Sequence, residues 1–294
     1  TMRRPDFAQL APTFNYPLNG GQAVRIGNPD LQPSTIQQVD LGVEWYFRKG
    51  SVLSAGYFYK GLEQVIGQEF QSRGARPPPV GTAKYPIICN PIAVSDTPPD
   101  PALCPNGGVP VDQIRFVNQP GGRIQGVEVA FQHYFNYLPQ PFRGLGVVAN
   151  YAYQDGQRDA TFTIGQVWQN QGVPAQFPLN FRGLSEHSYN ITVYYEKPKY
   201  GFSGRVRYTW RSSFLLQDSS DVSNGGPLYR DARGQLNAQI SYRLPGSWDH
   251  FTLLLWGVNL TKAITSETAL FPTGPTVRVG DSDRRVSIGL RARW

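Results

Sequence analysis

Residues 285–294 read RVSIGLRARW, and apolar and polar side chains alternate through the whole stretch. Val286, Ile288 and Leu290 fall on one parity, whereas the positions between them hold arginine, serine or glycine. Successive side chains of a β-strand point to opposite faces of its sheet. The stretch therefore predicts a strand with one apolar face and one polar face.

The same alternation recurs upstream and predicts nine strands in all. In residues 38–47, QVDLGVEWYF, Val39, Leu41 and Val43 share the apolar parity. The tight turn at Arg48–Gly50 joins this segment to the next one as a hairpin. The other predicted strands lie at 53–60, 127–132, 146–153, 189–195, 206–210, 236–242 and 251–262.

The composition indicates a membrane protein that crosses with strands. Charged residues make up 17% of the chain and aromatic residues 13%, against roughly 25% charged residues in an average soluble domain. No stretch approaches the roughly 20 apolar residues of a membrane-spanning helix, and the mean hydropathy is −0.38. Strands that alternate lipid-facing and lumen-facing residues reconcile these values. We therefore predict an all-β fold, a transmembrane antiparallel β-barrel.

The connections between the predicted strands alternate in length. Those at Arg48–Gly50, Asn136–Gly144, Lys197–Gly201 and Leu244–Asp249 are short or moderate. The intervening connections, at 67–120, 157–184, 215–228 and 265–280, are much longer. Short periplasmic turns and long extracellular loops are typical of outer-membrane barrels, and a soluble sandwich has no reason to sort its loops in this way.

Charged residues decide which face is the inner one. Seven arginines fall on the polar parity: Arg205, Arg207, Arg211, Arg243, Arg285, Arg291 and Arg293. Since an arginine that faces lipid near the midplane costs roughly 2–4 kcal/mol, we expect these side chains to face the lumen. There they either line a water-exposed inner wall of the barrel or contact an internal plug. Residues 251–262 are apolar on both faces, and we place Leu254, Trp256, Val258 and Leu260 outward.

Net charge and cysteine content exclude other classes. The net charge is +7, but the basic residues form no patch, so no nucleic-acid partner is expected. Cys89 and Cys104 are too few for a structural zinc site. In an oxidising compartment a disulfide between them is the simpler interpretation, worth about 3 kcal/mol; two free buried thiols are the alternative. No signal peptide opens the chain.

Several motifs then resemble one family. Thr1–Phe7, TMRRPDF, looks like the end of a barrel strand in TonB-dependent receptors of the Caulobacter and Xanthomonas type. Residues 27–33, GNPDLQP, followed by 40–47, DLGVEWYF, are similar to a signature of that family and its next strand. The match continues with YYEK at 194–197, YGFS at 200–203 and GVNLT at 257–261, in order and with matching spacing. Trp294 stands where such proteins usually end in an aromatic residue.

The resemblance implies a barrel of about 22 strands around an N-terminal plug, of which residues 1–294 are the C-terminal part, with nine to ten strands and no plug. It also implies an outer-membrane receptor of a Gram-negative bacterium, surrounded by outer-membrane lipid. TonB would drive import of a scarce nutrient through the missing plug. Carbohydrate uptake and iron-siderophore uptake stay open as substrate classes. A passive porin and a structural or adhesive surface barrel are the rival functions.

The residues show no pattern for catalysis, a metal site or a cofactor. His133, His187 and His250 are far apart and have no metal-ligand spacing. A barrel phospholipase needs a Ser–His pair on the lipid-facing wall, and no sequence pattern supports one. We therefore do not expect an enzyme.

The long connection at 157–184 holds the candidate ligand-binding residues. Aromatic and amide side chains suit sugar recognition, because they stack on the sugar and hydrogen-bond to it. Loops on the outer rim are rich in such residues in any case. The candidates are Trp168, Gln169, Asn170, Phe177, Asn180 and Arg182.

Overall fold

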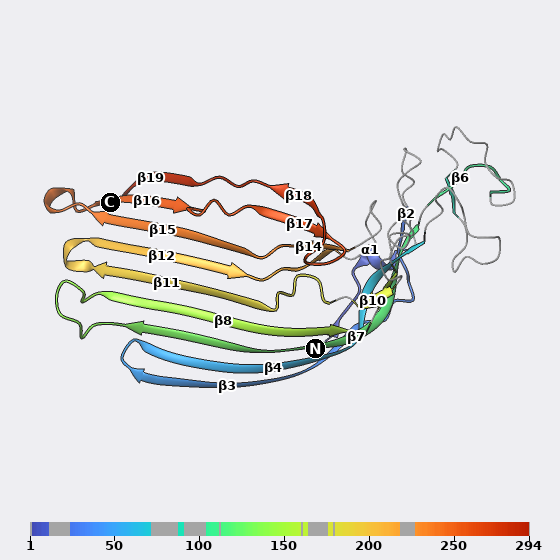
Figure 1. Ribbon diagram of the computed structural model, residues 1–294, viewed down its shortest axis with the longest axis horizontal. Coiled ribbons are helices and arrows are strands. Elements are labelled where there is room, and N and C mark those ends of the chain that lie inside the picture. The colour runs from blue at the N-terminus through green and yellow to red at the C-terminus, as the bar shows by residue number, and fades with distance from the viewer. Residues whose placement is uncertain are drawn as a thin grey trace.

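The computed structural model describes residues 2–11, 24–71, 88–90, 104–111, 113–159, 161–163, 176–178, 180–217 and 227–293. One large sheet dominates it, and all nine predicted strands are present (Figure 1). They are β3 (Ser34–Arg48), β4 (Ser51–Gln71), β7 (Gln113–Tyr134), β8 (Leu145–Arg158), β11 (His187–Lys197), β12 (Phe202–Arg211), β15 (Arg233–Arg243), β16 (Phe251–Val258) and β19 (Arg285–Ala292).

The nine strands form an antiparallel meander, in which each strand pairs with the next one along the chain. The short β1 (Met2–Arg3) adds to the free side of β3, and β2 (Val24–Ile26) pairs in parallel with β7. The four short connections all lie at one end of the sheet, as predicted (Figure 1). Two of them contain the single-turn helices η1 (Pro198–Tyr200) and η3 (Gly246–Trp248).

The register gives the sheet one apolar and one polar face. Val193 of β11 lies between Val147 of β8 and Val206 of β12. At the far edge Ile288 and Leu290 are 81% and 61% exposed. So broad an exposed apolar face suits lipid rather than water. Among the described residues, no helix is both long and apolar enough to cross a membrane.

The prediction for β16 is wrong for three of its four residues. Leu254 pairs with Ser241 and Trp256 pairs with Gln239, so both lie on the polar face, as does Val258 by alternation. Leu253 and Leu255 are the outward residues, 43% and 40% exposed. Local sequence could not decide this, because both faces of the strand are apolar and only the neighbours set the parity.

Leu260, the fourth residue, lies beyond the end of β16. Asn259 has φ 53°, which breaks the alternation of the strand. The Leu260 side chain then packs over the outward position Gly257, where an added Cβ would be 2.7 Å from Leu260 Cδ2. Trp256 covers the backbone of Gly289 in the same manner on the polar face.

The long connections contain more strand than we predicted. β4 and β7 stay paired beyond the predicted strands, from Gly61–Arg123 to Gln71–Gln113. This part of the pair includes Gly67, Pro120 and Gly121, residue types that are rare in strands and that the sequence pattern marks as turn. A separate sheet consists of β13 (Phe214–Gln217), β14 (Leu228–Arg230), β17 (Thr265–Ala269) and β18 (Thr276–Gly280). β9 (Thr161–Thr163) pairs with β10 (Gln176–Pro178).

A small core lies at the end of the β4–β7 extension. Val24, Ile26 and Val111 are buried there, and Ile88 packs against them. A disulfide joins Cys89 and Cys104, the pair considered from the sequence, with an S–S distance of 2.03 Å. β5 (Cys89–Asn90) pairs with β6 (Val109–Pro110) next to it. We call this region, residues 24–26, 88–90 and 104–111, the outer core.

The segment GNPDLQP, residues 27–33, connects the chain before β3 to the β7 extension through hydrogen bonds and close backbone packing. Gly27 approaches Ala11 so closely that an added Cβ would be 2.0 Å from the Ala11 carbonyl oxygen. Ala11 follows the short helix α1 (Phe7–Leu10). Asn118 accepts a hydrogen bond from the Gln32 backbone N–H at 2.8 Å and donates one to the Gln32 carbonyl at 2.9 Å. The motif therefore has a structural role in this chain.

Candidate functional site

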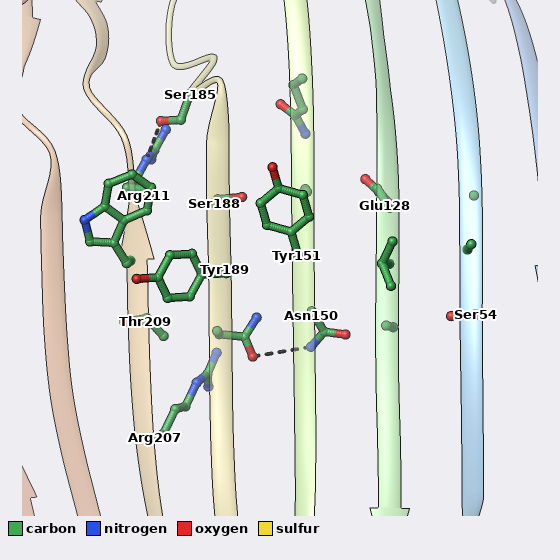
Figure 2. A pocket seen from close by; sticks show the side chains of 18 of the residues that line it. Ser54, Glu128, Asn150, Tyr151, Ser185, Ser188, Tyr189, Arg207, Thr209 and Arg211 are labelled. Atoms are coloured by element: carbon green, nitrogen blue, oxygen red, sulfur yellow. Dashed lines mark hydrogen bonds between the residues drawn. The ribbon is translucent and has the colours of Figure 1, made fainter.

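A row of polar positions crosses the polar face of the sheet, the face predicted to line the lumen. Cross-strand pairing aligns one residue from each of seven consecutive strands, β3 to β15: Glu44, Ser54, Ala130, Asn150, Asn190, Thr209 and Gln235. Asn150 donates a hydrogen bond to the Asn190 side-chain oxygen at 3.3 Å (Figure 2). Because six of these seven side chains can donate or accept hydrogen bonds, the row is a wall suited to polar ligands.

The row lines a broad, open hollow of about 1150 Å³. Above it stands a second row in which Glu128, Ser188 and Arg211 face the same space (Figure 2). Arg233 also lines the hollow. A hollow of this size is comparable with cavities that hold small-molecule ligands. The seven strands that line it share one hydrogen-bonded sheet, so the wall is a rigid support.

Arg211 is fixed at the end of the hollow next to the long connections. Its Nε donates to Ser185 Oγ at 2.8 Å (Figure 2). Its Nη2 donates to the Gly183 carbonyl, also at 2.8 Å. The guanidinium also lies 3.8 Å from the centre of the Phe214 ring, a cation–π contact. All three partners are uncharged, so none of them neutralises the positive charge of Arg211.

The charges are divided between the two sides of the hollow. Glu44 and Glu128 stand on the β3–β7 side, and Arg207, Arg211 and Arg233 stand on the β12–β15 side. The electrostatic potential therefore changes sign across the hollow.

The structure places the seven predicted arginines as follows. Arg205, Arg207 and Arg211 alternate along β12, Arg243 ends β15, and Arg285 and Arg291 lie in β19. Arg205 Nη2 donates to Gln239 Oε1 at 2.6 Å. Arg293 directly follows β19. Within the strands, all of these arginines pair across the sheet in the register of the polar face, and their orientation to a lumen stays a prediction.

The predicted loop residues are only partly within the described chain. Trp168, Gln169 and Asn170 lie outside the described residues, as does the side chain of Phe177, whose backbone is in β10. Asn180 and Arg182 are exposed, and the Asn180 side-chain oxygen accepts the Phe181 N–H at 2.7 Å. Ligand contact by these six residues is untested.

Sequence reasoning missed the role of Asn259, which is 2% exposed. Its backbone N–H donates to Asn237 Oδ1 at 2.9 Å, and its side chain donates to the Ala263 carbonyl at 3.2 Å and to Ser282 Oγ at 2.9 Å. The side-chain oxygen accepts the Ala263 N–H at 2.9 Å. One residue thus ties β15 to the connections that follow β16 and precede β19. Its place in GVNLT is the only signal in the sequence.

The four-stranded outer sheet contains a buried ion-pair cluster. The Glu267 side chain is 5% exposed and lies 2.8 Å from Arg230 Nη2 and 3.1 Å from Arg278 Nη1. Asp231 accepts hydrogen bonds from Ser266 and Thr268 beside it. Burial raises the pKa of the neighbouring Tyr229 phenol above its ordinary value. The two arginines compensate the buried carboxylate, and the cluster ties β14, β17 and β18 together.

These strands match one family of outer-membrane proteins. A family model described as "TonB dependent receptor-like, beta-barrel" matches residues 1–260. The chain belongs to this family. The resemblance drawn from the sequence motifs is thereby confirmed, and so is the antiparallel barrel fold class. No curated protein sequence matches the chain.

Solved structures with the receptor-like barrel fold cover almost all of the chain. A mutant of the ferric enterobactin receptor PfeA from Pseudomonas aeruginosa covers 99% of it at 16% identity, with a TM-score of 0.57, over 36% of its own length. The copper transporter OprC covers 98% at 12% identity and TM-score 0.54, over 34% of its length. The outer membrane transporter YddB from Escherichia coli covers 94% at 11% identity and TM-score 0.52, also over 34% of its length. The chain thus spans about a third of each relative.

The outward face of this receptor-like barrel also holds a Ser–His pair that the sequence did not indicate. Ser51 Oγ lies 2.7 Å from His133 Nδ1, although the residues are 82 positions apart. They are 3% and 8% exposed, with the rings of Phe47 and Phe135 against the imidazole. Among the described residues no carboxylate contacts His133. The pair links the start of β4 to the end of β7 beside the short-turn end of the sheet.

Proposed function

We propose that this chain is the C-terminal part of the barrel of a TonB-dependent import receptor in the outer membrane of a Gram-negative bacterium. One observation carries the proposal. In a member of this receptor-like family, seven consecutive strands present a polar hollow on the face opposite an exposed apolar face. The apolar face contacts lipid, and the hollow offers a polar ligand a path across the membrane.

In the proposed mechanism the wall is passive and a plug does the gating. A scarce nutrient binds at the end of the long connections, and TonB moves a plug inside the barrel. The sheet supplies rigid hydrogen-bonding groups at fixed positions, such as the linked amides of Asn150 and Asn190. Such groups bind a polar ligand without reorganising, which limits the entropic cost of binding.

The proposal includes the loop residues predicted from the sequence. Trp168, Gln169, Asn170, Phe177, Asn180 and Arg182 would contact the ligand at the outer end. Asn180 and Arg182 follow β10 and precede Ser185, which lines the hollow, so they stand next to its entrance in the chain. Alanine at Asn180 or Arg182 should weaken surface binding of the ligand without reducing the amount of folded receptor.

Deletion of TonB tests the function. Cells that express the full-length protein are given radiolabelled ferric citrate, an anionic chelate, or maltotriose, a neutral oligosaccharide. We expect TonB deletion to abolish receptor-dependent uptake of the transported compound and to leave its surface binding intact, because binding needs no energy input. A strain that lacks the receptor gives the background.

Two other outcomes separate the rival functions. Uptake that continues undiminished without TonB would support a passive porin, in which flux depends on the gradient and pore size alone. A structural or adhesive barrel would show no receptor-dependent uptake of any compound and no growth phenotype.

A further inference from the structure

The inward wall formed by β11, β12, β15, β16 and β19 is strongly basic. Its strands hold seven inward arginines against a single inward acid, Glu196. The arginines are Arg205, Arg207, Arg211, Arg233, Arg243, Arg285 and Arg291. We call this set the arginine ladder, because it continues from one end of the strands to the other.

The cross-strand register fixes the steps of the ladder. Arg211 and Arg233 are direct partners at the end next to the long connections. Arg205 lies two positions before Arg207, in the middle of β12. At the short-turn end Arg243 and Arg291 both pair with Thr252, from opposite sides of β16. An anion that follows this wall therefore meets guanidiniums at both ends of the sheet and in its middle.

The pairing of Arg211 with Arg233 by itself lowers the stability of the sheet, because like charges directly opposite each other destabilise a sheet. Both guanidiniums are nevertheless held by neutral groups. Arg211 donates to Ser185 and Gly183, and Arg233 donates to the Ala263 carbonyl at 3.4 Å and to Ser282 Oγ at 3.2 Å. No carboxylate of the described residues forms an ion pair with either one. The pair thus directs two uncompensated positive charges toward the hollow.

Among the four ladder arginines that line the two hollows, Arg205, Arg207, Arg211 and Arg233, Arg207 is the one whose guanidinium has no described partner. It lines the large hollow and the smaller one of about 330 Å³ beside it. Its guanidinium is exposed and makes no hydrogen bond or ion pair with any residue that the structure describes. Five free N–H donors in a planar fork match the two oxygens of a carboxylate or the oxygens of a phosphate.

We propose that the arginine ladder makes this wall selective for an anionic ligand that carries several oxyanion groups, carboxylates or phosphates. The inference rests on the proposed import function and names its substrate class: an anionic compound rather than a neutral sugar. Rings of arginine or lysine are the usual means by which a pore favours anions. The acidic residues Glu44 and Glu128, on the far side of the hollow, repel the same ligand toward the ladder.

Equilibrium binding to the purified full-length protein tests the inference without any role for TonB. The probes are citrate, inorganic pyrophosphate and maltotriose, titrated calorimetrically at low and high salt. We expect citrate or pyrophosphate to bind, with an affinity that falls as salt screens the charges, and maltotriose not to bind. Comparison of the affinities for citrate and for pyrophosphate shows whether the wall prefers carboxylate or phosphate ligands.

Substitutions then assign the binding to the ladder. Arg207→Gln should weaken binding of the anion about tenfold, the usual effect of losing one charged hydrogen bond, and Arg207→Lys should retain part of it. Since Arg207 has no described partner, its loss should not impair folding. Arg143→Gln is the matched control, because Arg143 is exposed in a short turn outside the wall. The affinity of the Arg143→Gln variant for the anion should equal that of the unmodified protein.

Three results would overturn the inference: binding of maltotriose in preference to both anions, binding of neither anion, or an unchanged anion affinity in Arg207→Gln. These results are independent of the import experiment. Anion binding by the ladder combined with TonB-independent uptake would contradict the proposed function alone. TonB-dependent uptake combined with maltotriose binding would contradict the ladder alone.

Discussion

Asn259 shows how much one buried side chain can hold in place. It combines a left-handed backbone, φ 53°, with hydrogen bonds to three other segments. Loss of buried hydrogen-bond partners costs about 1–3 kcal/mol, and a left-handed backbone costs a residue with a β-carbon roughly 1–2 kcal/mol. Asparagine tolerates that backbone better than most residues do. The side chain thus serves both the turn and the network.

Two substitutions at Asn259 separate these effects. Asn259→Gly keeps the left-handed backbone but removes the side-chain bonds, and Asn259→Ala loses both. We therefore expect both variants to lower the Tm of the folded barrel, with alanine the lower of the two. The Tm is read from the heat-induced shift in mobility on detergent gels. Lys262→Gly is the control, since Lys262 is exposed, has φ 52° and its side chain forms an exposed ion pair with Asp283 at 4.0 Å, which contributes little to the Tm. Equal Tm values for Asn259→Ala and the unmodified protein would contradict the conclusion that this hydrogen-bond network stabilises the barrel.

At the scale of the strands, the sequence predicts most of the sheet. The period of two located eight of the nine strands, because each of these has one apolar and one polar face. It failed to orient β16, where Leu254 and Trp256 on one face and Leu253 and Leu255 on the other are all apolar. There the parity comes from the partners Ser241 and Gln239, which no local pattern contains.

Cysteine labelling tests the faces of β16 and β19. Leu255→Cys and Leu290→Cys should react with a lipid-soluble maleimide in membranes that contain the full-length protein. Leu254→Cys and Arg291→Cys should not, because they lie on the polar face. Cys89 and Cys104 form a disulfide and so give little background labelling. Preferential labelling at 254 or 291 would show that the register of that strand is shifted by one residue.

For the whole molecule, the candidate site was less predictable than the fold. The polarity of each strand is local, but the hollow depends on which residues become neighbours across seven strands. Glu44 and Gln235 lie in one row although 191 positions separate them. Pairing over such distances follows from turn lengths and register, and a single sequence does not encode it in any local pattern. The opposition of Arg211 and Arg233 was unpredictable for the same reason.

The molecule also divides into two regions whose stability has different sources. The sheet is held by continuous strand pairing, whereas the outer core has only a few buried residues, among them Val24, Ile26 and Val111, and the disulfide. A bridge between residues 15 positions apart contributes about 3 kcal/mol by restricting the unfolded chain. For so small a core this is a large share of the stability.

Removal of the disulfide should therefore open the outer core and leave the barrel folded. We expect Cys89→Ser/Cys104→Ser to become sensitive to protease near residues 104–111, whereas the gel-shift Tm of the barrel stays unchanged. Mass spectrometry of unreduced peptides first establishes that the bond is present in protein from membranes. Thr276→Ser is the control, because it changes an exposed residue of β18 outside the outer core and should leave the protease pattern as it is. A double variant whose barrel melts earlier would show that the two regions fold as one unit.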